Sequence, residues 1–520
     1  MNVAAGREMT IMVDTGQKLV PMFIVLGVLL LFVIAGLLYK TRDQSEYGVS
    51  GRYAGRIGGG AAIASNWMSA ASFLGIAGLI YLYGYAALAY VIGWTGGYVL
   101  LLVLLAGQLR RFGKYTAPDF IGERYDSPGA RLLSAMISVA ITLIYSVAQF
   151  KGIGIVFAWL MGIDYSRGVI LGASILMAYF ILSGMLGVAR SQQLQYFVLI
   201  VTFVLPLMFL AYRLGYFWVL PQFGYGRAMT DLSAEFNINM AAPFREQGLF
   251  HWTALCFTLM FGTVGLPHVL SRFYTVSNIR DARWSVAWGL FFIALIYWSA
   301  PAYAVFGRLL EARAGMLLTP EIAYKMADIV VLRTALMGGL PEWLVGMLAA
   351  GAVCAAFFTV AGLLMTGAAS VSYDIYYRLI NPQASEGARM KIAKGTTLVL
   401  ASIVLCGALN PPGLIAEIAA VAFALAGNTI FPAFLLGIWW GGTNRQGVIT
   451  GMLTGILITF SQPLFGDIVP LINTIFPLTA SALCGAPLVI IIMVLVSRFT
   501  EPPPERIRRF LADEVHGHLE

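Results

Sequence analysis

The sequence predicts an all-α polytopic membrane protein. Hydrophobic residues make up 59% of the 520 residues and charged residues only 11%, whereas an ordinary globular domain is about 45–50% apolar and about 25% charged. The apolar residues also form runs of about 20 residues, the length that a helix needs to cross a hydrocarbon core of about 30 Å. A helix satisfies its own backbone hydrogen bonds in lipid, so each run is predicted to be a transmembrane helix.

These apolar runs predict about thirteen spans. The predicted spans are 20–39, 57–81, 86–108, 132–161, 168–189, 193–213, 249–270, 284–307, 341–377, 392–409, 413–437, 446–465 and 478–497. An odd number of spans places the two termini on opposite sides of the bilayer. Lys and Arg are more than twice as frequent in the connections on the C-terminal side as in those on the other side, so the N-terminus is predicted outside and the C-terminus inside.

The composition argues against several other classes of protein. The net charge of +8 is explained by basic residues in the inner connections, so no nucleic-acid partner is expected. The four cysteines lie inside apolar runs without metal-type spacing, which indicates small buried side chains and gives no support to haem or iron–sulfur sites. No catalytic domain stands out, so the chain is predicted not to be an enzyme.

Two of the predicted spans contain segments that would interrupt a regular helix. Residues 58–75 combine glycines with small hydroxyl residues and Asn66, and residues 261–268 (FGTVGLPH) place two glycines, a proline and a histidine in one apolar run. Small residues also let helices pack closely, but irregular backbone at membrane depth is tolerated only around a cavity or within protein. The two interruptions fall in the second and seventh spans, five spans apart, which is the spacing of a five-plus-five inverted repeat.

At these residues the chain resembles the sodium:solute symporter family, and most closely its acetate/monocarboxylate permease branch. The resemblance covers most of residues 40–440. It rests on residues 261–268 with their continuation to 277, and on residues 69–76 (SAASFLGI), 145–149 (YSVAQ), 360–362 (VAG) and 371–376 (VSYDIY).

The resemblance implies a leucine-transporter-like fold with one extra N-terminal and two extra C-terminal helices. The implied divisions are 1–56 for the N-terminal tail and extra span, 57–213 for the first repeat, 214–248 for an outside loop, 249–437 for the second repeat, 438–497 for the last two spans and 498–520 for the inner tail. Substrate is then expected near the midplane, with transport by alternating access. The long outside connections 214–248 and 308–340 are expected to be ordered over the pore.

The resemblance also implies positions for a sodium ion. Its ligands would be the backbone carbonyls of Ser65, Met68 and Ala355 and the hydroxyl of Thr359. Sodium-driven sugar carriers have a second hydroxyl where this chain has Phe358, which carries no oxygen, and an acidic residue where it has Gln192. The expected coupling ion is therefore left as sodium or a proton, and no tightly bound cofactor is expected.

Several polar residues are candidates to bind a substrate carboxylate. Ser69, Ser72, Gln149 and Thr263 could donate hydrogen bonds to it, and Phe73 lies in the same motif.

Two ionisable residues inside predicted spans have several possible roles. Lys151 is some ten residues from the nearer end of its span, about 15 Å, which is more than a lysine side chain reaches. It could pair with the substrate, stand in for sodium or form a structural ion pair. His268 is also a candidate substrate-binding residue, and it could take part in gating or proton handling or pack within the protein. Asp374, at the inner end of its span, is expected to form a gate salt bridge with a basic loop.

The leading hypothesis is a secondary active symporter that imports a small, acetate-like monocarboxylate with sodium or a proton. It would lie in a bacterial inner membrane, with the lipid bilayer as its surroundings and a small membrane subunit or a second copy as possible partners. The alternative is a sensor or regulatory subunit of a signalling system built on a transporter fold. A channel is less consistent with broken helices.

Overall fold

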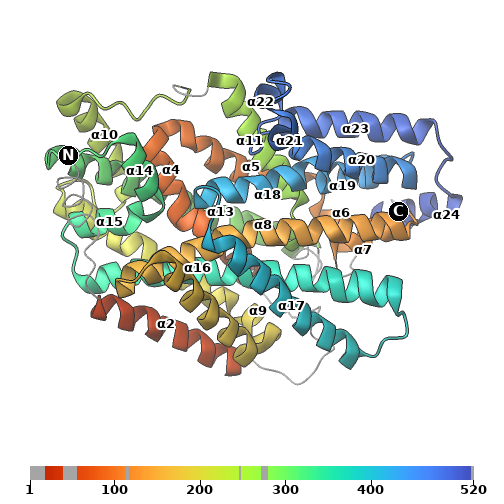
Figure 1. Cartoon of the computed structure of the whole chain (residues 1–520), viewed down its shortest axis with the longest axis horizontal. Coiled ribbons are helices and arrows are strands. Elements are labelled where there is room, and N and C mark those ends of the chain that lie inside the picture. The colour runs from red at the N-terminus through yellow and green to blue at the C-terminus, as the bar shows by residue number, and fades with distance from the viewer. Residues whose placement is uncertain (1–17, 39–55, 113–115, 245–247, 271–278, 517–520) are drawn as a thin grey trace.

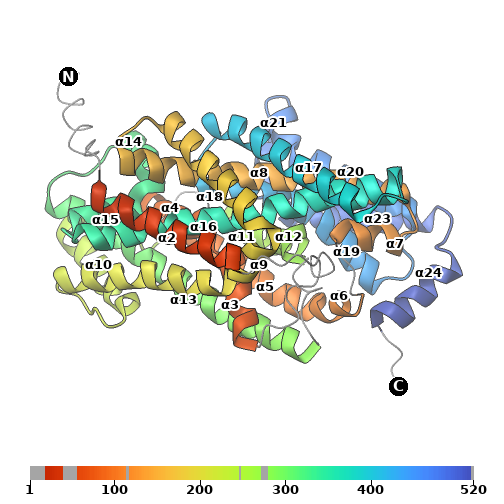
Figure 2. The ribbon, with the colours of Figure 1, turned by 90° about the horizontal axis from the view of Figure 1, so that it is seen from below.

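The protein is a bundle of long helices that run mostly along one axis (Figures 1 and 2). The computed structural model describes residues 18–38, 56–112, 116–244, 248–270 and 279–516. Within these ranges the chain forms helices and short connections and has no β-strand. The predicted all-α class is therefore confirmed.

The helices that form the bundle agree closely with the predicted spans. They are α2 (Leu19–Leu38), α3 (Arg56–Trp67), α4 (Ile76–Tyr83), α5 (Leu88–Leu104), α6 (Ala106–Phe112), α8 (Pro128–Met161), α9 (Tyr165–Arg213), α11 (Gly248–Gly265), α12 (Pro267–Leu270), α13 (Ile279–Arg313), α16 (Glu342–Ala369), α17 (Glu386–Leu409), α18 (Ile415–Asn428), α19 (Ile430–Trp439), α20 (Arg445–Thr459) and α23 (Ala482–Arg498). Among the described residues, 8 helices are long and apolar enough to cross a membrane, with two shorter apolar helices besides. The number of thirteen spans stays a prediction.

Local sequence signals explain where the central helix α8 begins and ends. The Ser127 hydroxyl accepts a hydrogen bond from the amide of Ala130, and Pro128 occupies the first turn, where its missing N–H costs nothing. The helix ends at Gly162, which adopts a left-handed conformation with φ of 63°. These signals place 34 residues in one helix, enough to cross a bilayer core with a turn or more to spare at each end.

Both predicted interruptions are present. The first broken helix runs from α3 through the irregular residues Met68 and Ser69 into a π-helical turn, Ala71–Gly75, and then α4. The second broken helix consists of α11, the irregular residue Leu266 and α12. A third interruption, which we did not predict, separates α18 from α19 at Thr429, whose φ and ψ are −118° and −70°.

The helix α9 contains two predicted spans in one continuous element of 49 residues. A straight helix of that length would extend about 74 Å, more than twice the thickness of a bilayer core. The hydroxyl of Tyr165 at its start donates to the carbonyl of Ala408 near the end of α17, and Arg213 at its end donates to the carbonyl of Gly339 just before α16. Since α17 runs back from the far end of α16, both ends of α9 lie at one end of the molecule, as two antiparallel spans require.

Helix packing follows the pattern expected of an inverted repeat. The first helix of the first half, α3, packs along the second helix of the other half, α13, while α5 packs along α11. In the same way α8 packs against α18, and α16 against α9. Exchanging the two halves leaves this set of contacts unchanged, so the packing is that of a five-plus-five repeat. The residue boundaries of the repeats stay a prediction.

The long connections gather at the two ends of the bundle. The helices α10 (Pro221–Phe236), α14 (Pro320–Met326) and α15 (Val330–Met337) lie at the left-hand end of Figures 1 and 2, and α7 (Ala117–Arg124) and α24 (Glu505–Phe510) lie at the right-hand end. We call these the outer and inner ends, following the predicted orientation, which stays a prediction.

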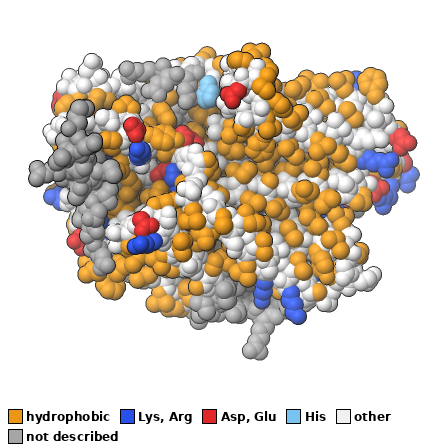
Figure 3. Space-filling model, in the orientation of Figure 1, with side chains coloured by type: hydrophobic (Ala, Val, Ile, Leu, Met, Phe, Trp, Pro, Cys, Tyr) orange, Lys and Arg blue, Asp and Glu red, His pale blue; other side chains and the backbone are white. Residues whose placement is uncertain are grey.

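The described parts of the connections at the outer end contain helices, and their expected position over the pore stays a prediction. Residues 320–337, comprising α14, a 3-10 turn at Ala327–Ile329 and α15, are called the outer cap below. Hydrophobic side chains cover most of the face shown in Figure 3, and a group of Lys and Arg side chains lies at its inner end.

The remaining elements are short connecting or terminal segments, except for the π-helical segment Ser370–Ile380, which continues α16 and packs against α8 and α17. They are a 3-10 turn at Gly84–Ala87, α21 (Ser461–Phe465), α22 (Leu471–Ile475), and two π-helical segments, Ser370–Ile380 at the end of α16 and Leu511–His516 after α24.

Candidate functional site

The gap in the first broken helix is filled by a side chain from α8. The Oε1 atom of Gln149 accepts a hydrogen bond of 2.8 Å from the amide of Ala70, directly after the irregular residues. A methyl group added to Gly152 would lie 2.6 Å from the Cβ of Ala70, so glycine at this position lets α8 approach the break closely. Gln149 is fully buried, and its Nε2 atom has no hydrogen-bond partner among the described residues. One buried donor therefore points into the region of the break without an acceptor.

Hydroxyl groups surround the same break. The Tyr145 hydroxyl on α8 donates to Ser69 Oγ at 3.3 Å, and the Tyr297 hydroxyl on α13 lies 3.0 Å from Ser72 Oγ. Tyr297 also accepts a 2.9 Å hydrogen bond from the indole nitrogen of Trp67, the last residue of α3. The predicted residues Ser69, Ser72 and Gln149 are therefore brought together, and two tyrosines that the sequence did not single out join them.

Aromatic rings close the space around these polar groups. Trp67 contacts Trp94 and Phe423 with ring centroids 6.4 and 5.7 Å apart, and Trp94 stacks on Tyr297 at 6.0 Å. Phe423 also contacts Tyr145 at 5.7 Å. All five rings are buried. The site therefore combines a few hydrogen-bonding groups with an apolar wall, the composition typical of a site for a small molecule.

Three other predicted site residues lie outside this group or at its edge. The Thr263 hydroxyl donates to the carbonyl of Leu259 within its own helix, and its Cβ faces Gly97 of α5. The Phe73 ring packs against Phe203 of α9, with centroids 4.5 Å apart. His268 lies at the edge of the group, with its ring 5.8 Å from that of Tyr145. Their binding roles stay predictions.

Three of the four residues expected to hold sodium have oxygens suited to a ligand, whereas the carbonyl of Ala355 lies inside the continuous helix α16. Helix α16 packs against both α3 and the π-helical turn of the first broken helix. No backbone amide is seen to donate to the carbonyl of Ser65 or of Met68 among the described residues, and the Ser72 amide, four residues after Met68, bonds to the Ser69 hydroxyl instead. The Thr359 hydroxyl on α16 is buried and has no hydrogen-bond partner among the described residues. Free carbonyls and a buried unpartnered hydroxyl are suitable ligands for a hard cation, so these three residues fit a sodium ion, which stays a prediction.

The residue next to Thr359 serves a packing role. The Phe358 ring meets the ring of Phe32 on α2 edge-on, with centroids 4.9 Å apart. The position that provides a second hydroxyl in sugar carriers is thus used here to dock the extra N-terminal helix. The other departure, Gln192, has its side chain outside the described residues.

The structure shows an ion pair for Lys151, one of the three roles that the sequence left open. Its Nζ lies 2.5 Å from Asp328 Oδ2 in the outer cap and donates to the carbonyl of Gly413 at 2.7 Å. Asp328 also accepts from the amide of Ile415, the first residue of α18. Burial raises the pKa of the Asp328 carboxyl, and the Lys151 ammonium opposes that shift. The pair therefore joins α8 to the cap at a cost in desolvation.

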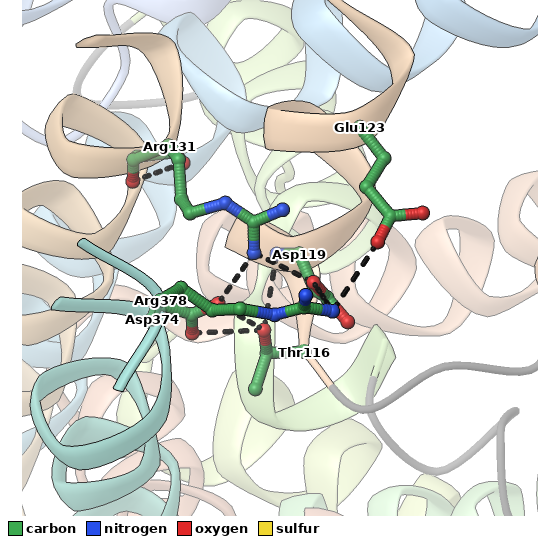
Figure 4. A network of polar contacts seen from close by, with 7 residues as sticks. Thr116, Asp119, Glu123, Arg131, Asp374 and Arg378 are labelled. Carbon is green, nitrogen blue, oxygen red and sulfur yellow. Dashed lines mark hydrogen bonds and ion pairs between the residues drawn. The ribbon is translucent and has the colours of Figure 1, made fainter. Parts of the chain in front are cut away.

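A larger network of charges lies at the inner end (Figure 4). Arg131, near the start of α8, is 2.6 Å from Asp119 of α7 and 3.4 Å from Asp374, which follows α16. Thr116 donates to Asp374 at 2.8 Å, and Arg378 lies 3.5 Å from Asp119 and 3.4 Å from Glu123. The expected salt bridge of Asp374 is thus confirmed, and its role as a gate stays a prediction. We call these six residues the inner network.

Several residues of these clusters could not be selected from the sequence. Lys151 implied an acidic partner, but the outer connections contain several acids, including Asp328, and nothing in the sequence favours one of them. Tyr297 lies in an aromatic-rich run that reads as an ordinary span. The break at Thr429 has a local signal, the proline three residues later, which restricts the preceding backbone.

Comparison with known proteins identifies the group to which the chain is related. A model described as the sodium:solute symporter family matches residues 47–455. A protein named as an uncharacterized symporter in Cupriavidus necator is 30% identical, with 82% of each chain covered, and one of that name in Bacillus subtilis is 30% identical, with 80% of each chain covered.

Two solved structures share the fold. A Na+-coupled sialic acid symporter in a substrate-bound outward-open state superposes with a TM-score of 0.76 at 15% identity, covering 94% of this chain and 99% of that one. MhsT in complex with L-phenylalanine gives a TM-score of 0.53 at 12% identity, covering 86% of this chain and 99% of that one. At these identities the likeness concerns the fold alone.

Proposed function

The chain belongs to the sodium:solute symporter family, and from that premise we propose that this symporter imports a small, acetate-like monocarboxylate together with sodium or a proton. Transport would proceed by alternating access across a bacterial inner membrane. A secondary symporter must bind its solute where both faces of the membrane can reach it in turn. The broken helices and the polar group around Gln149 provide such a place, at the centre of the bundle.

One observation carries the choice of substrate. The buried Nε2 of Gln149 has no acceptor among the described residues, beside the hydroxyls of Ser69 and Ser72. A buried donor left unpaired is costly, and a carboxylate oxygen would satisfy it with a charge-assisted hydrogen bond. The aromatic wall leaves the site suited to a short apolar chain behind the carboxylate. Together these features favour a small monocarboxylate over a larger polar solute.

Charge at the site agrees with this proposal. The residues gathered around the break are neutral, so no fixed negative charge there opposes the binding of an anion. A monocarboxylate entering with one cation adds no net charge. The oxygens of Ser65, Met68, Ala355 and Thr359 would hold a sodium ion beside the substrate if sodium is the coupling ion.

Uptake by the full chain in proteoliposomes tests the proposal. Labelled acetate, propionate, pyruvate and lactate are supplied with an inward sodium gradient, with an inward proton gradient and with neither. At least one acid is expected to accumulate under one of the two gradients. Absence of uptake for every acid under both gradients would contradict the proposed substrate class.

Variants of Gln149 test the site within the same assay. Gln149→Leu removes the donor and is expected to raise the KM by about tenfold or more, since a hydrogen bond to a charged group is worth about 1.5–3 kcal/mol. Gln149→Glu still accepts from the Ala70 amide but adds a negative charge, so uptake should be lost. Gln222→Leu, a matched change of a buried glutamine that bonds Ser299 on α13, should leave the KM unchanged.

The coupling ion is tested through Thr359. Thr359→Val keeps the shape of the side chain and removes its oxygen, so sodium-driven uptake should fall while Thr359→Ser retains it. If Thr359→Val and the wild type respond equally to sodium, Thr359 is not a ligand. Uptake driven only by the proton gradient would assign the proton as the coupling ion.

A further inference from the structure

The pair of Lys151 and Asp328 occupies a position between the buried site and the outer face. Lys151 follows Gln149 by two residues on α8, a rise of about 3 Å. Its side chain is 13% exposed, against full burial for Gln149. The two side chains leave α8 on different faces, so the ammonium lies near the level of Gln149 but faces the outer cap and the start of α18. Gly152, the next residue, faces both Ala70 at the break and Ile415, whose amide bonds to Asp328.

The outer cap is attached firmly on one side of the molecule. Glu311 of α13 accepts hydrogen bonds from the Tyr81 hydroxyl of α4 and from Arg333 of the cap. A methyl group added to Gly78 of α4 would lie 2.4 Å from the carbonyl oxygen of Ala327 in the cap. The cap, α4 and α13 are thus held together by several buried contacts.

On the other side, Asp328 provides the polar attachment of the cap to α8 among the described residues, while the cap is attached to the start of α18 both by Asp328 and by Tyr324, whose hydroxyl donates to Glu417 at 2.8 Å. The Asp328 carboxylate meets Lys151 and the amide of Ile415. When the cap, α4 and α13 move away from α8, Asp328 leaves with the cap. Lys151 and the carbonyl of Gly413 then stay behind on the opposite wall.

Space for a small molecule already lies beside this contact. A cavity of about 310 Å³ is lined by residues of α4, α5, α11 and α18, among them Tyr83, Tyr90, His251, Gly413 and Glu417. Its wall includes Gly413, the carbonyl partner of Lys151. Tyr90 in the same wall contacts Trp94 with ring centroids 5.5 Å apart, and Trp94 stacks on Tyr297 of the buried site. One residue of the cavity wall, Tyr90, thus packs directly against the aromatic wall of the site.

We propose that Lys151 is an outer binding site for the carboxylate of the substrate, and that Asp328 occupies this site as a tethered competitor while the cap is closed. This inference rests on the proposed monocarboxylate substrate, which carries the same functional group as Asp328. A buried ammonium left alone is costly, so the cap opens more readily when a second carboxylate replaces Asp328. The substrate then passes from Lys151 to Gln149 as Asp328 returns.

The burial of Asp328 lowers the net desolvation cost of such an exchange. The closed state holds this carboxylate away from water, and opening returns it to water. The incoming carboxylate loses its hydration while Asp328 regains its own, and Lys151 has a carboxylate partner at every step. Two carboxylates crowded on one ammonium would repel each other, so binding of the substrate and closure through Asp328 exclude one another.

Uptake kinetics of four variants of the full chain test this exchange. Asp328→Asn keeps the size of the side chain and an oxygen for the Ile415 amide but removes the competing charge, so the KM for the monocarboxylate should fall at least threefold. Lys151→Met should raise the KM at least tenfold. The double variant should have the same KM as Lys151→Met, because Asp328 has nothing to compete for once the Lys151 ammonium is removed.

The matched control is Glu321→Gln. Glu321 is an exposed acid in the same cap, paired with Lys325 at 2.8 Å, so removing it changes the charge of the cap equally. Its KM should equal that of the wild type. A lower KM in this variant as well would show a general effect of charge and overturn the role of Asp328.

The outcomes separate this inference from the proposed function. No uptake or binding of any monocarboxylate by the wild type overturns both. Uptake by the wild type with an unchanged or higher KM in Asp328→Asn overturns the exchange alone, because a structural ion pair predicts loss of activity on removing either partner. A lowered KM requires folded protein, so the supporting result cannot arise from misfolding. Uncharged propionamide, used as a competitor of labelled propionate, should have the same inhibition constant in the wild type and in Asp328→Asn.

Discussion

Helix α8 carries two cations, Arg131 near its start and Lys151 ten residues before its end, and the two are held in different ways. Arg131 and Lys151 are separated by about 30 Å along the helix, the thickness of a bilayer core. Arg131 contacts two buried carboxylates, which belong to a network of six residues from three parts of the chain. Lys151 contacts one carboxylate and one carbonyl.

The distance of each contact from the buried site differs as well. Lys151 lies about 3 Å along α8 from Gln149, whereas Arg131 lies about 27 Å from it. The ion pair of Lys151 therefore lies at nearly the same level along α8 as Gln149, on another face of the helix, whereas the inner network lies about 27 Å away along α8. The comparison indicates that the outer end opens at lower cost, because fewer buried contacts must break.

The largest expected effect comes from the inner network. Arg131→Met leaves Asp119 and Asp374 buried without their closest cation and should lower the free energy of unfolding by about 3–5 kcal/mol. Thermal unfolding of the purified protein in detergent measures this change. Arg167→Met, at an exposed ion pair with Asp164, is the matched control and should show no measurable change. Equal melting temperatures for Arg131→Met and Arg167→Met would contradict a stabilising role for the inner network.

A smaller loss is expected at the outer end. Asp328→Asn should lower the free energy of unfolding by about 1–3 kcal/mol, since Lys151 keeps the Gly413 carbonyl and the asparagine still accepts from the Ile415 amide. The same thermal measurement applies, with Glu321→Gln as the control. If the loss exceeded that of Arg131→Met, the outer end would be the more firmly closed of the two, and the comparison would be reversed.

The smallest effect is expected from Arg378, which has the most exposed charged side chain of the inner network. Its side chain is 36% exposed, and its contacts with Asp119 and Glu123 are 3.5 and 3.4 Å long. Arg378→Gln should therefore cost no more than about 1 kcal/mol. A loss as large as that of Arg131→Met would show that the network acts as one unit and not through its shortest contact.

Much of the fold could be predicted because its signals are local. Apolar runs identified the long helices, and the glycines, Pro267 and small polar residues identified both broken helices within a few residues. The ends of α8 agree with a serine cap and a glycine stop. The continuous helix over 165–213 was divided correctly into two spans by hydropathy, although its backbone hydrogen bonding shows no break.

The candidate site could be predicted only in part. Ser69, Ser72 and Gln149 were selected by motif and come together in the structure. Thr263 and Phe73 belong to the same kind of motif, but their side chains face neighbouring helices. A motif states which residues occur near a break, whereas the face of the helix on which each one lies depends on the angle at which the broken halves meet.

The sequence by itself determined that the chain fills a membrane, where its helices break and that Lys151 needs a partner. Hydropathy, glycine and proline act on the backbone where they stand, and a buried charge is costly wherever it is placed. Only the tertiary structure decided that Asp328 meets Lys151, that Arg131 meets Asp119 and Asp374, and that Tyr297 joins the site. Contacts between residues far apart in the chain depend on how the two halves of the bundle pack together, and no local property of the sequence encodes that packing.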